Sequence, residues 1–206
     1  MPRDKNAFQA LRIFFTGVGG QGTLLATRLV GEAALEQGLP AAISEIHGMA
    51  QRGGVVESSV VVGDVFSPTI ADGEADTLIA FEPLEALRAL PKCHAKSLVI
   101  STTLPIIPFT VATGRQSYPE IATINELIRA NVEYLIWVDA NELARKAGSE
   151  KSANVVVVGA LAGTETLPIE EISWQAALKK IIPDRMLEAN QLAFRLGYEM
   201  SHGKQR

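Results

Sequence analysis

Cysteine is nearly absent from this sequence, since Cys93 is the only one among 206 residues. A lone thiol forms no internal disulfide, and an iron–sulfur cluster needs a set of cysteine ligands, so we expect no cluster in this chain. Histidine is scarce too: His47, His94 and His202 lie far apart, and none has a cysteine at zinc-ligand spacing. Cys93 stands between lysines, where an inert thiol in a loop is a better expectation than a reactive one.

Basic clusters and long apolar runs are also lacking. The chain has 19 Lys and Arg against 23 Asp and Glu, without a basic stripe, so we expect no nucleic-acid partner. The longest apolar stretch, 155–162, is too short to cross a bilayer, and residues 1–10 lack the apolar core of a signal peptide. We therefore expect a cytoplasmic protein without membrane contact, folded as one domain over residues 1–206.

Strands and helices alternate along most of the chain. Four consecutive valines in 152–163 favour a strand, but Asn154, Gly159 and Ala160 interrupt it, so this segment stays ambiguous. The alternation predicts a three-layer, Rossmann-like α/β fold with a mostly parallel sheet and C-terminal helices. The pattern predicts strands at 11–16, 41–46, 55–62, 76–81, 97–101 and 132–138, and helices at 23–37, 82–90, 120–130, 141–147, 169–182 and 185–200.

A glycine-rich turn joins the first predicted strand to the first predicted helix. Gly17, Gly19 and Gly22 match G-x-G-x-x-G, and free amides at the start of a helix attract an anion such as phosphate. Glu45 lies near the end of the second predicted strand, where dinucleotide-binding folds place their ribose-binding carboxylate. The turn alone leaves three interpretations open: NAD or FAD binding, binding of another anion or a partner, and tight packing.

A polar, glycine-rich segment follows the second predicted strand. Ligands and partners bind at the carboxyl ends of strands in open α/β sheets, and we expect the turn and this segment to meet there, at two adjacent strands. The candidate site residues are Gly17, Gly19, Gly20, Gln21, Gly22, Thr23, Glu45, His47, Gly48, Met49, Gln51, Arg52, Gly53, Gly54 and Asn154.

GVGGQG at 17–22 and SEIHGMAQRGG at 44–54 together resemble the gamma domain of 2-oxoacid:ferredoxin oxidoreductases. AFEPLEALR at 80–88, SANVVVVGALAG at 152–163 and NQLAFRLG at 190–197 extend this resemblance over nearly the whole chain. Within the family, the short form with EPLEALR is similar to the beta subunits of indolepyruvate:ferredoxin oxidoreductases. The resemblance implies a buried helix, not a strand, at 152–163.

The resemblance also implies a division of labour between subunits. A large partner would bind thiamine diphosphate, Mg²⁺ and iron–sulfur clusters. The complex would oxidatively decarboxylate a 2-oxoacid, an aryl pyruvate by similarity, to an acyl-CoA, with coenzyme A as co-substrate and ferredoxin as electron acceptor. This chain would bind no cofactor alone, and it lacks the Gly-Asp-Gly and Asn pattern of thiamine sites.

Several candidates have a simpler structural interpretation beside the functional one. Glu45 and His47 would line a cleft facing the partner's cofactor, or would bond to loop backbone. Arg52 would bind a carboxylate or phosphate, or form a surface salt bridge. Asn154 and Glu82 are expected chiefly to cap or complement helix N-termini. Two alternatives for the whole chain remain: a free-standing NAD(P)-dependent Rossmann dehydrogenase and an anion-binding domain.

Overall fold

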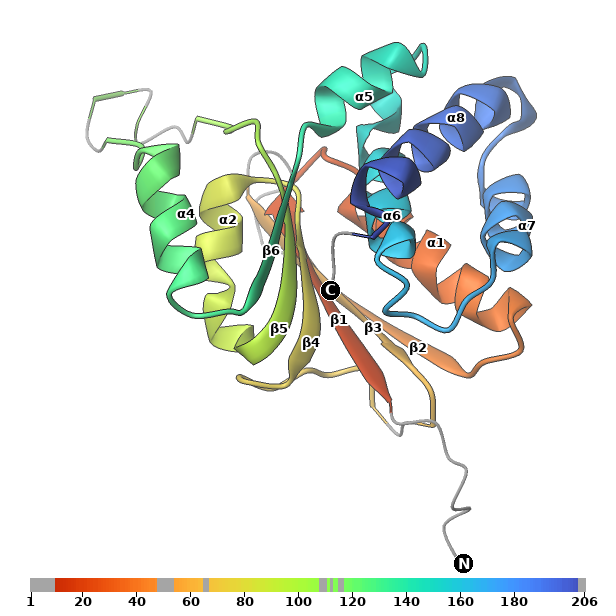
Figure 1. Cartoon of the computed structure of the whole chain (residues 1–206), viewed down its shortest axis with the longest axis horizontal. Helices are drawn as coiled ribbons and strands as arrows, with labels where there is room; N and C mark the ends of the chain where they lie inside the picture. Colours follow the sequence, from red (N-terminus) through yellow and green to blue (C-terminus); the bar gives the residue numbers. More distant parts are fainter. Residues whose placement is uncertain are drawn as a thin grey trace, which may run out of the picture.

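Six strands form one sheet in the order β2-β3-β1-β4-β5-β6 (Figure 1). This computed structural model describes residues 10–47, 54–64, 67–107, 111, 113–114 and 117–203. The strands are β1 (Leu11–Val18), β2 (Ala41–His47), β3 (Val55–Val62), β4 (Ala75–Ala80), β5 (Cys93–Thr102) and β6 (Tyr134–Val138).

Helices cover both faces of the sheet, which gives the expected three layers (Figure 1). Helices α2 and α4 lie on one face, α1 and α6 lie on the other, and α7 and α8 pack outside α1 and α6. The helices are α1 (Thr23–Glu36), α2 (Pro83–Arg88), α4 (Ile121–Arg129), α5 (Ala140–Lys146), α6 (Ala153–Gly163), α7 (Glu171–Ile181) and α8 (Asp184–Ser201), with short 3₁₀ turns η1 (Leu90–Lys92) and η2 (Glu150–Ser152).

The sheet is mostly parallel, as expected, but one strand runs against the others. β1, β4, β5 and β6 pair in parallel, whereas β3 pairs antiparallel with both β1 and β2. The expectation that the first two strands are neighbours is therefore wrong, because β3 lies between them. Its last residues, Val60, Val61 and Val62, are at most 1% exposed, so this apolar run needs an interior place in the sheet.

Each face of the sheet has its own hydrophobic core, as strand alternation requires. In β1, Ile13 and Phe15 point into the core formed with α1, α6, α7 and α8. Phe14 points to the other face, where Ile124 and Ile128 of α4 pack. The larger core lies under the C-terminal helices, so these helices complete the domain.

The valine-rich segment forms helix α6, which confirms the expectation from family resemblance. All but one of its residues are buried, because the sheet covers one side and α8 crosses the other. A Cβ atom on Gly159 would lie 2.0 Å from the Phe194 carbonyl oxygen, and one on Gly197 would lie 2.0 Å from that of Val156. Backbone-to-backbone packing thus outweighs the strand propensity of the four valines.

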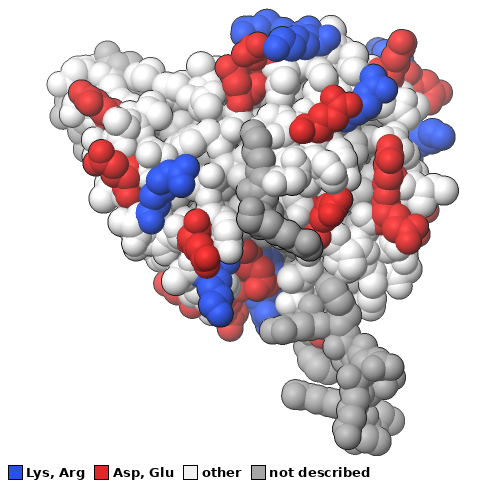
Figure 2. All heavy atoms as spheres, in the orientation of Figure 1, with Lys and Arg blue, Asp and Glu red and all other residues white. Residues whose placement is uncertain are grey.

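Cys93 is the first residue of strand β5, so the expectation that it lies in a loop is wrong. Burial raises the pKa of its thiol to about 11. In Figure 2, basic and acidic side chains are interspersed over the visible face. Among the described helices, none has the length and apolar character that crossing a membrane would require.

Candidate functional site

The glycine turn lies between the carboxyl end of β1 and the start of α1. Gly22 is the N-terminal cap of α1 and has a φ of 79°, a left-handed conformation that L side chains rarely adopt. A Cβ atom there would also lie 2.4 Å from the Asn154 side-chain nitrogen. Glycine is required at this position both for its backbone angle and for the close approach of α6.

The side chain of Gln21 braces the turn from inside. Its Oε1 atom accepts a hydrogen bond from the Val18 amide at 2.6 Å, and its Nε2 atom donates to the Phe81 carbonyl at 2.5 Å. The Thr102 hydroxyl donates to the same carbonyl at 2.7 Å. Gln21 therefore joins the carboxyl ends of β1 and β4, with β5 tied in through Thr102.

The two glycine-rich segments meet, as expected. The Gly19 amide donates to the Gly54 carbonyl at 2.9 Å, immediately before β3 begins. The Glu45 side chain is exposed, and the backbone of His47 pairs with Val56. The other predicted residues of this loop lie outside the described residues: Gly48, Met49, Gln51, Arg52 and Gly53.

Asn154 links α6 to the glycine turn. It is the second residue of α6, and the N-terminal cap is Ser152, so the expectation that Asn154 is the cap is wrong. Its Nδ2 atom donates to the Gly22 carbonyl at 3.2 Å, and its Oδ1 atom accepts from the Val155 amide at 3.0 Å. The N-termini of α1 and α6 are thereby held together at one edge of the sheet, where their dipoles favour negative charge.

A small cavity of about 230 Å³ opens beside the turn. Gly20, Gln21 and Asn154 line it, together with residues that sequence reasoning missed: Phe81, Thr102, Leu104, Ile106, Asn141, Glu150, Lys151 and Ala153. Most of these lie just beyond the carboxyl ends of β4, β5 and β6 or at the start of α6. Because ligands bind at the carboxyl ends of strands in such sheets, the residues just after β4, β5 and β6 could have been predicted as site residues.

Glu82 is buried behind this cavity and holds Ile106, one of its lining residues. Its Oε2 atom accepts from the Glu85 amide at 2.9 Å, which confirms that it complements the start of α2. Its Oε1 atom also accepts from the Ile106 amide at 3.2 Å and from the Tyr118 hydroxyl at 2.5 Å. Burial and the bond to Glu82 raise the pKa of Tyr118, so it stays a donor. This buried carboxylate fixes the segment after β5 beside the glycine turn.

The arrangement of β1, β3 and β2 fits a dinucleotide poorly. A ribose-binding carboxylate belongs on the strand next to β1, but Glu45 is one strand further away, roughly 10 Å from β1 at ordinary strand spacing. The Gly19 amide already donates to the Gly54 carbonyl, so it is not free to bind a phosphate. Both features oppose binding of an adenosine where dinucleotide-binding folds place it.

We therefore expect NAD to bind more weakly than micromolar. Calorimetric titration of the purified chain checks this, with coenzyme A as a second titrant that carries a comparable adenosine diphosphate. A dissociation constant for NAD near 1 µM, about −8 kcal/mol, would contradict the geometry.

The chain has relatives of known name and fold. Residues 12–200 match the family described as pyruvate ferredoxin/flavodoxin oxidoreductase. Indolepyruvate oxidoreductase subunit IorB of Methanothermobacter thermautotrophicus is 41% identical over 186 residues, or 90% of this chain and 95% of that protein. The subunit of the same name from Archaeoglobus fulgidus is 41% identical over 191 residues, with 93% and 95% covered. The keto/oxoacid ferredoxin oxidoreductase gamma subunit of Geobacter sulfurreducens shares the fold, with a TM-score of 0.68, 23% identity and 93% and 98% coverage.

Proposed function

Because the chain belongs to the pyruvate ferredoxin/flavodoxin oxidoreductase family, we propose that it is the small subunit of an indolepyruvate:ferredoxin oxidoreductase. The observation that carries this proposal is the likeness to IorB subunits over nearly the full length of both chains. The complex would oxidatively decarboxylate an aryl pyruvate to its acyl-CoA and pass the electrons to ferredoxin. Nothing in these comparisons supports the free-standing NAD(P)-dependent dehydrogenase.

The partner in this proposal is a large subunit that holds thiamine diphosphate, Mg²⁺ and the iron–sulfur clusters. One cysteine in 206 residues leaves this chain without a cluster's ligands, so electron transfer needs cysteines from elsewhere. The single cysteine and the use of ferredoxin fit a cytoplasmic enzyme. The small subunit contributes a shaped surface beside the partner's cofactor, and no redox centre.

The partner surface proposed for this chain is the sheet edge at the glycine turn. The segment 103–107, which follows β5, exposes Leu104, Ile106 and Ile107 there, at 52%, 37% and 52%. Glu82 holds this segment from beneath by accepting from the Ile106 amide. A fixed segment with several exposed large apolar side chains is typical of an interface. Glu45, His47 and Arg52 would lie at the same interface, facing the partner's thiamine site.

The turn also offers backbone amides that could donate hydrogen bonds to an anion. We propose that this anion is a phosphate of coenzyme A or an acidic group of the partner. The Gly19 and Gln21 amides are already used, by Gly54 and Val18. The amides of Gly20, Gly22 and Thr23 have no acceptor within the described part of the chain, and Lys151 lines the adjoining cavity. The buried hydroxyl of Thr23 also lacks a partner there, which supports a further polar group at this turn.

Assembly with the co-expressed large subunit tests the proposal. Leu104→Asp is expected to reduce co-purification about tenfold or more, because it places a charge in an apolar interface. Leu35→Asp is the matched control: Leu35 is 54% exposed against 52% for Leu104, but lies near the C-terminal end of α1. Tagged pull-down and size-exclusion chromatography measure both variants.

If both variants co-purify equally well with the large subunit, segment 103–107 is not part of the interface. Failure of the wild-type chain to bind any large subunit encoded with it would overturn the proposed function itself.

A further inference from the structure

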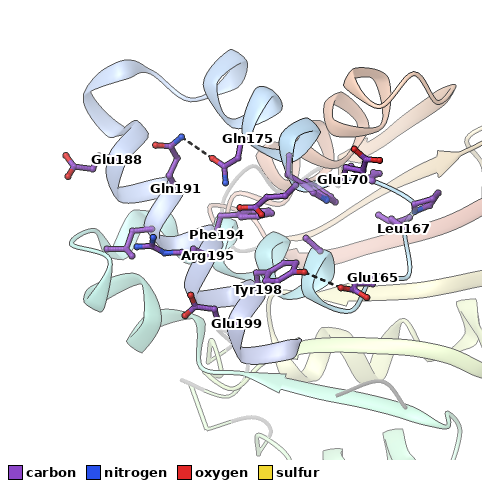
Figure 3. A pocket seen from close by; sticks show the side chains of 16 residues that line it. Glu165, Leu167, Glu170, Gln175, Glu188, Gln191, Phe194, Arg195, Tyr198 and Glu199 are labelled. Atoms are coloured by element: carbon purple, nitrogen blue, oxygen red, sulfur yellow. Dashed lines mark hydrogen bonds between the residues drawn. The ribbon is translucent and has the colours of Figure 1, made fainter. Parts of the chain in front are cut away.

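A second and larger hollow lies on the outside of the helical layer. It has a volume of about 910 Å³ and is formed by α7, α8 and residues 165–170 (Figure 3). It meets α6 at Ala162, eight residues after Asn154 and hence roughly 12 Å further along that helix. It shares no lining residue with the cavity at the glycine turn, so the proposed function does not account for it.

The floor of this groove is aromatic. Trp174 of α7 and Phe194 of α8 are 3% and 2% exposed, and their ring centroids lie 5.7 Å apart. Tyr198 borders them, and its hydroxyl donates to Glu165 at 3.3 Å (Figure 3). Because the Trp174 and Phe194 rings are already packed against each other, they lose little side-chain entropy when a ligand binds beside them.

The rim of the groove is acidic. Its single basic side chain among the described residues is Arg195. Within the described part of the chain, Glu165 pairs with His202 in addition to its hydrogen bond from Tyr198, and the other four rim carboxylates form no ion pair. A rim with five carboxylates and one basic side chain around an apolar floor complements a basic, amphipathic ligand. The five rim carboxylates belong to Glu165, Glu170, Glu171, Glu188 and Glu199.

The length of the groove indicates what kind of ligand fits it. Glu188 and Glu199 border it eleven residues apart on α8, a distance of roughly 16 Å along the helix axis. A small molecule on the aromatic floor would leave one acidic end uncovered. A helix of about the same number of residues would span both ends, in the helix-in-groove mode of recognition.

We propose that this groove binds an amphipathic helix of a partner protein, with its apolar face on the partly exposed Ile169, Leu192 and Tyr198 beside the buried aromatic pair, and with Lys or Arg at both ends. The inference is independent of the proposed function, because it concerns a surface remote from the glycine turn. It also predicts that Glu188 and Glu199 act together, one at each end of the bound helix.

Fluorescence of Trp174 tests the proposal with a defined probe. Trp137→Phe leaves Trp174 as the only tryptophan, since the chain has two. The probe is a tryptophan-free helical peptide of about sixteen residues, with leucines on one face and lysines at both ends. We expect a saturable change in Trp174 emission that weakens with added salt. The double variant Glu188→Lys, Glu199→Lys is expected to weaken binding about tenfold or more.

Controls separate this groove from a general attraction to acidic surfaces. The double variant Glu126→Lys, Glu133→Lys changes the net charge equally at exposed positions of α4 and the loop after it, and should bind the peptide like the parent. A peptide with glutamates in place of the lysines should not bind. Circular dichroism and thermal midpoints check that both double variants fold.

Three outcomes would overturn the proposal. One is equal loss of binding in the two double variants. Another is displacement of the peptide by benzylamine at micromolar concentration, which would make the groove a small-molecule site. The third is self-association of the chain in sedimentation runs that only Glu188→Lys, Glu199→Lys abolishes, which would make a second copy the occupant.

Discussion

Purified alone, the chain is expected to oxidise no 2-oxoacid, even with thiamine diphosphate, Mg²⁺, coenzyme A and ferredoxin supplied. Oxidative decarboxylation releases two electrons, and ferredoxin receives them through clusters that this chain lacks the cysteines to hold. Cys93 offers no substitute, because burial raises its pKa to about 11 and leaves little thiolate at neutral pH.

Activity should appear when the large subunit is co-expressed. Ferredoxin reduction, followed by absorbance, and formation of the acyl-CoA both measure it, with indolepyruvate as the substrate. The Leu104→Asp complex should lose activity in proportion to lost assembly, while the Leu35→Asp complex keeps it. Turnover by the lone chain at the rate of the complex would refute the division of labour between subunits.

Gly159→Ala is expected to lower the free energy of unfolding by about 3 kcal/mol. Alanine normally stabilises a helix by about 1 kcal/mol relative to glycine. Here its Cβ atom would lie 2.0 Å from the Phe194 carbonyl oxygen, so α8 must move away from α6. Gly197→Ala meets the Val156 carbonyl at the same distance and should have a similar effect. For a chain of this length the thermal midpoint should fall by roughly 6–12 °C.

The control for these variants is Gly203→Ala, just beyond α8. Gly203 has a φ of 77° and open space around its Cβ position, so alanine there costs only the left-handed conformation, about 1 kcal/mol. Thermal and urea unfolding measure all three proteins. An unchanged midpoint for Gly159→Ala would mean that α6 and α8 do not pack backbone to backbone.

Local sequence patterns predicted most helices and strands within a few residues. Strand 55–62 and the start of helix 23–37 agree with β3 and α1, because alternation and glycine punctuation are local signals. The place of β3 in the sheet was not predictable in this way. It depends on pairing between strands separated in sequence, and β3 reaches β1 only by turning back from β2.

The candidate site was predicted in part, for the same physical reason. The contact between Gly19 and Gly54 followed from two motifs at the carboxyl edge of the sheet. Asn154 was a candidate site residue, but its bond to Gly22 was not predicted, because the two residues are 132 positions apart in sequence. Lys151 gave no signal of its own, since a single lysine before a helix is common. The acidic groove depends on how α7 and α8 meet, which neither helix reveals alone.

The position of α6 and α8 has a consequence for synthesis on the ribosome. β1, made early, lies inside the sheet, yet the helices that cover its larger core come from residues 153–201. Until those residues emerge, Ile13, Phe15 and Val60 have only α1 to shield them on that face. Chains grow at about 5–20 residues per second, so this apolar face stays open for seconds while the C-terminal helices are made. The nascent chain thus keeps this apolar face exposed to association with other chains until α8 packs against α6.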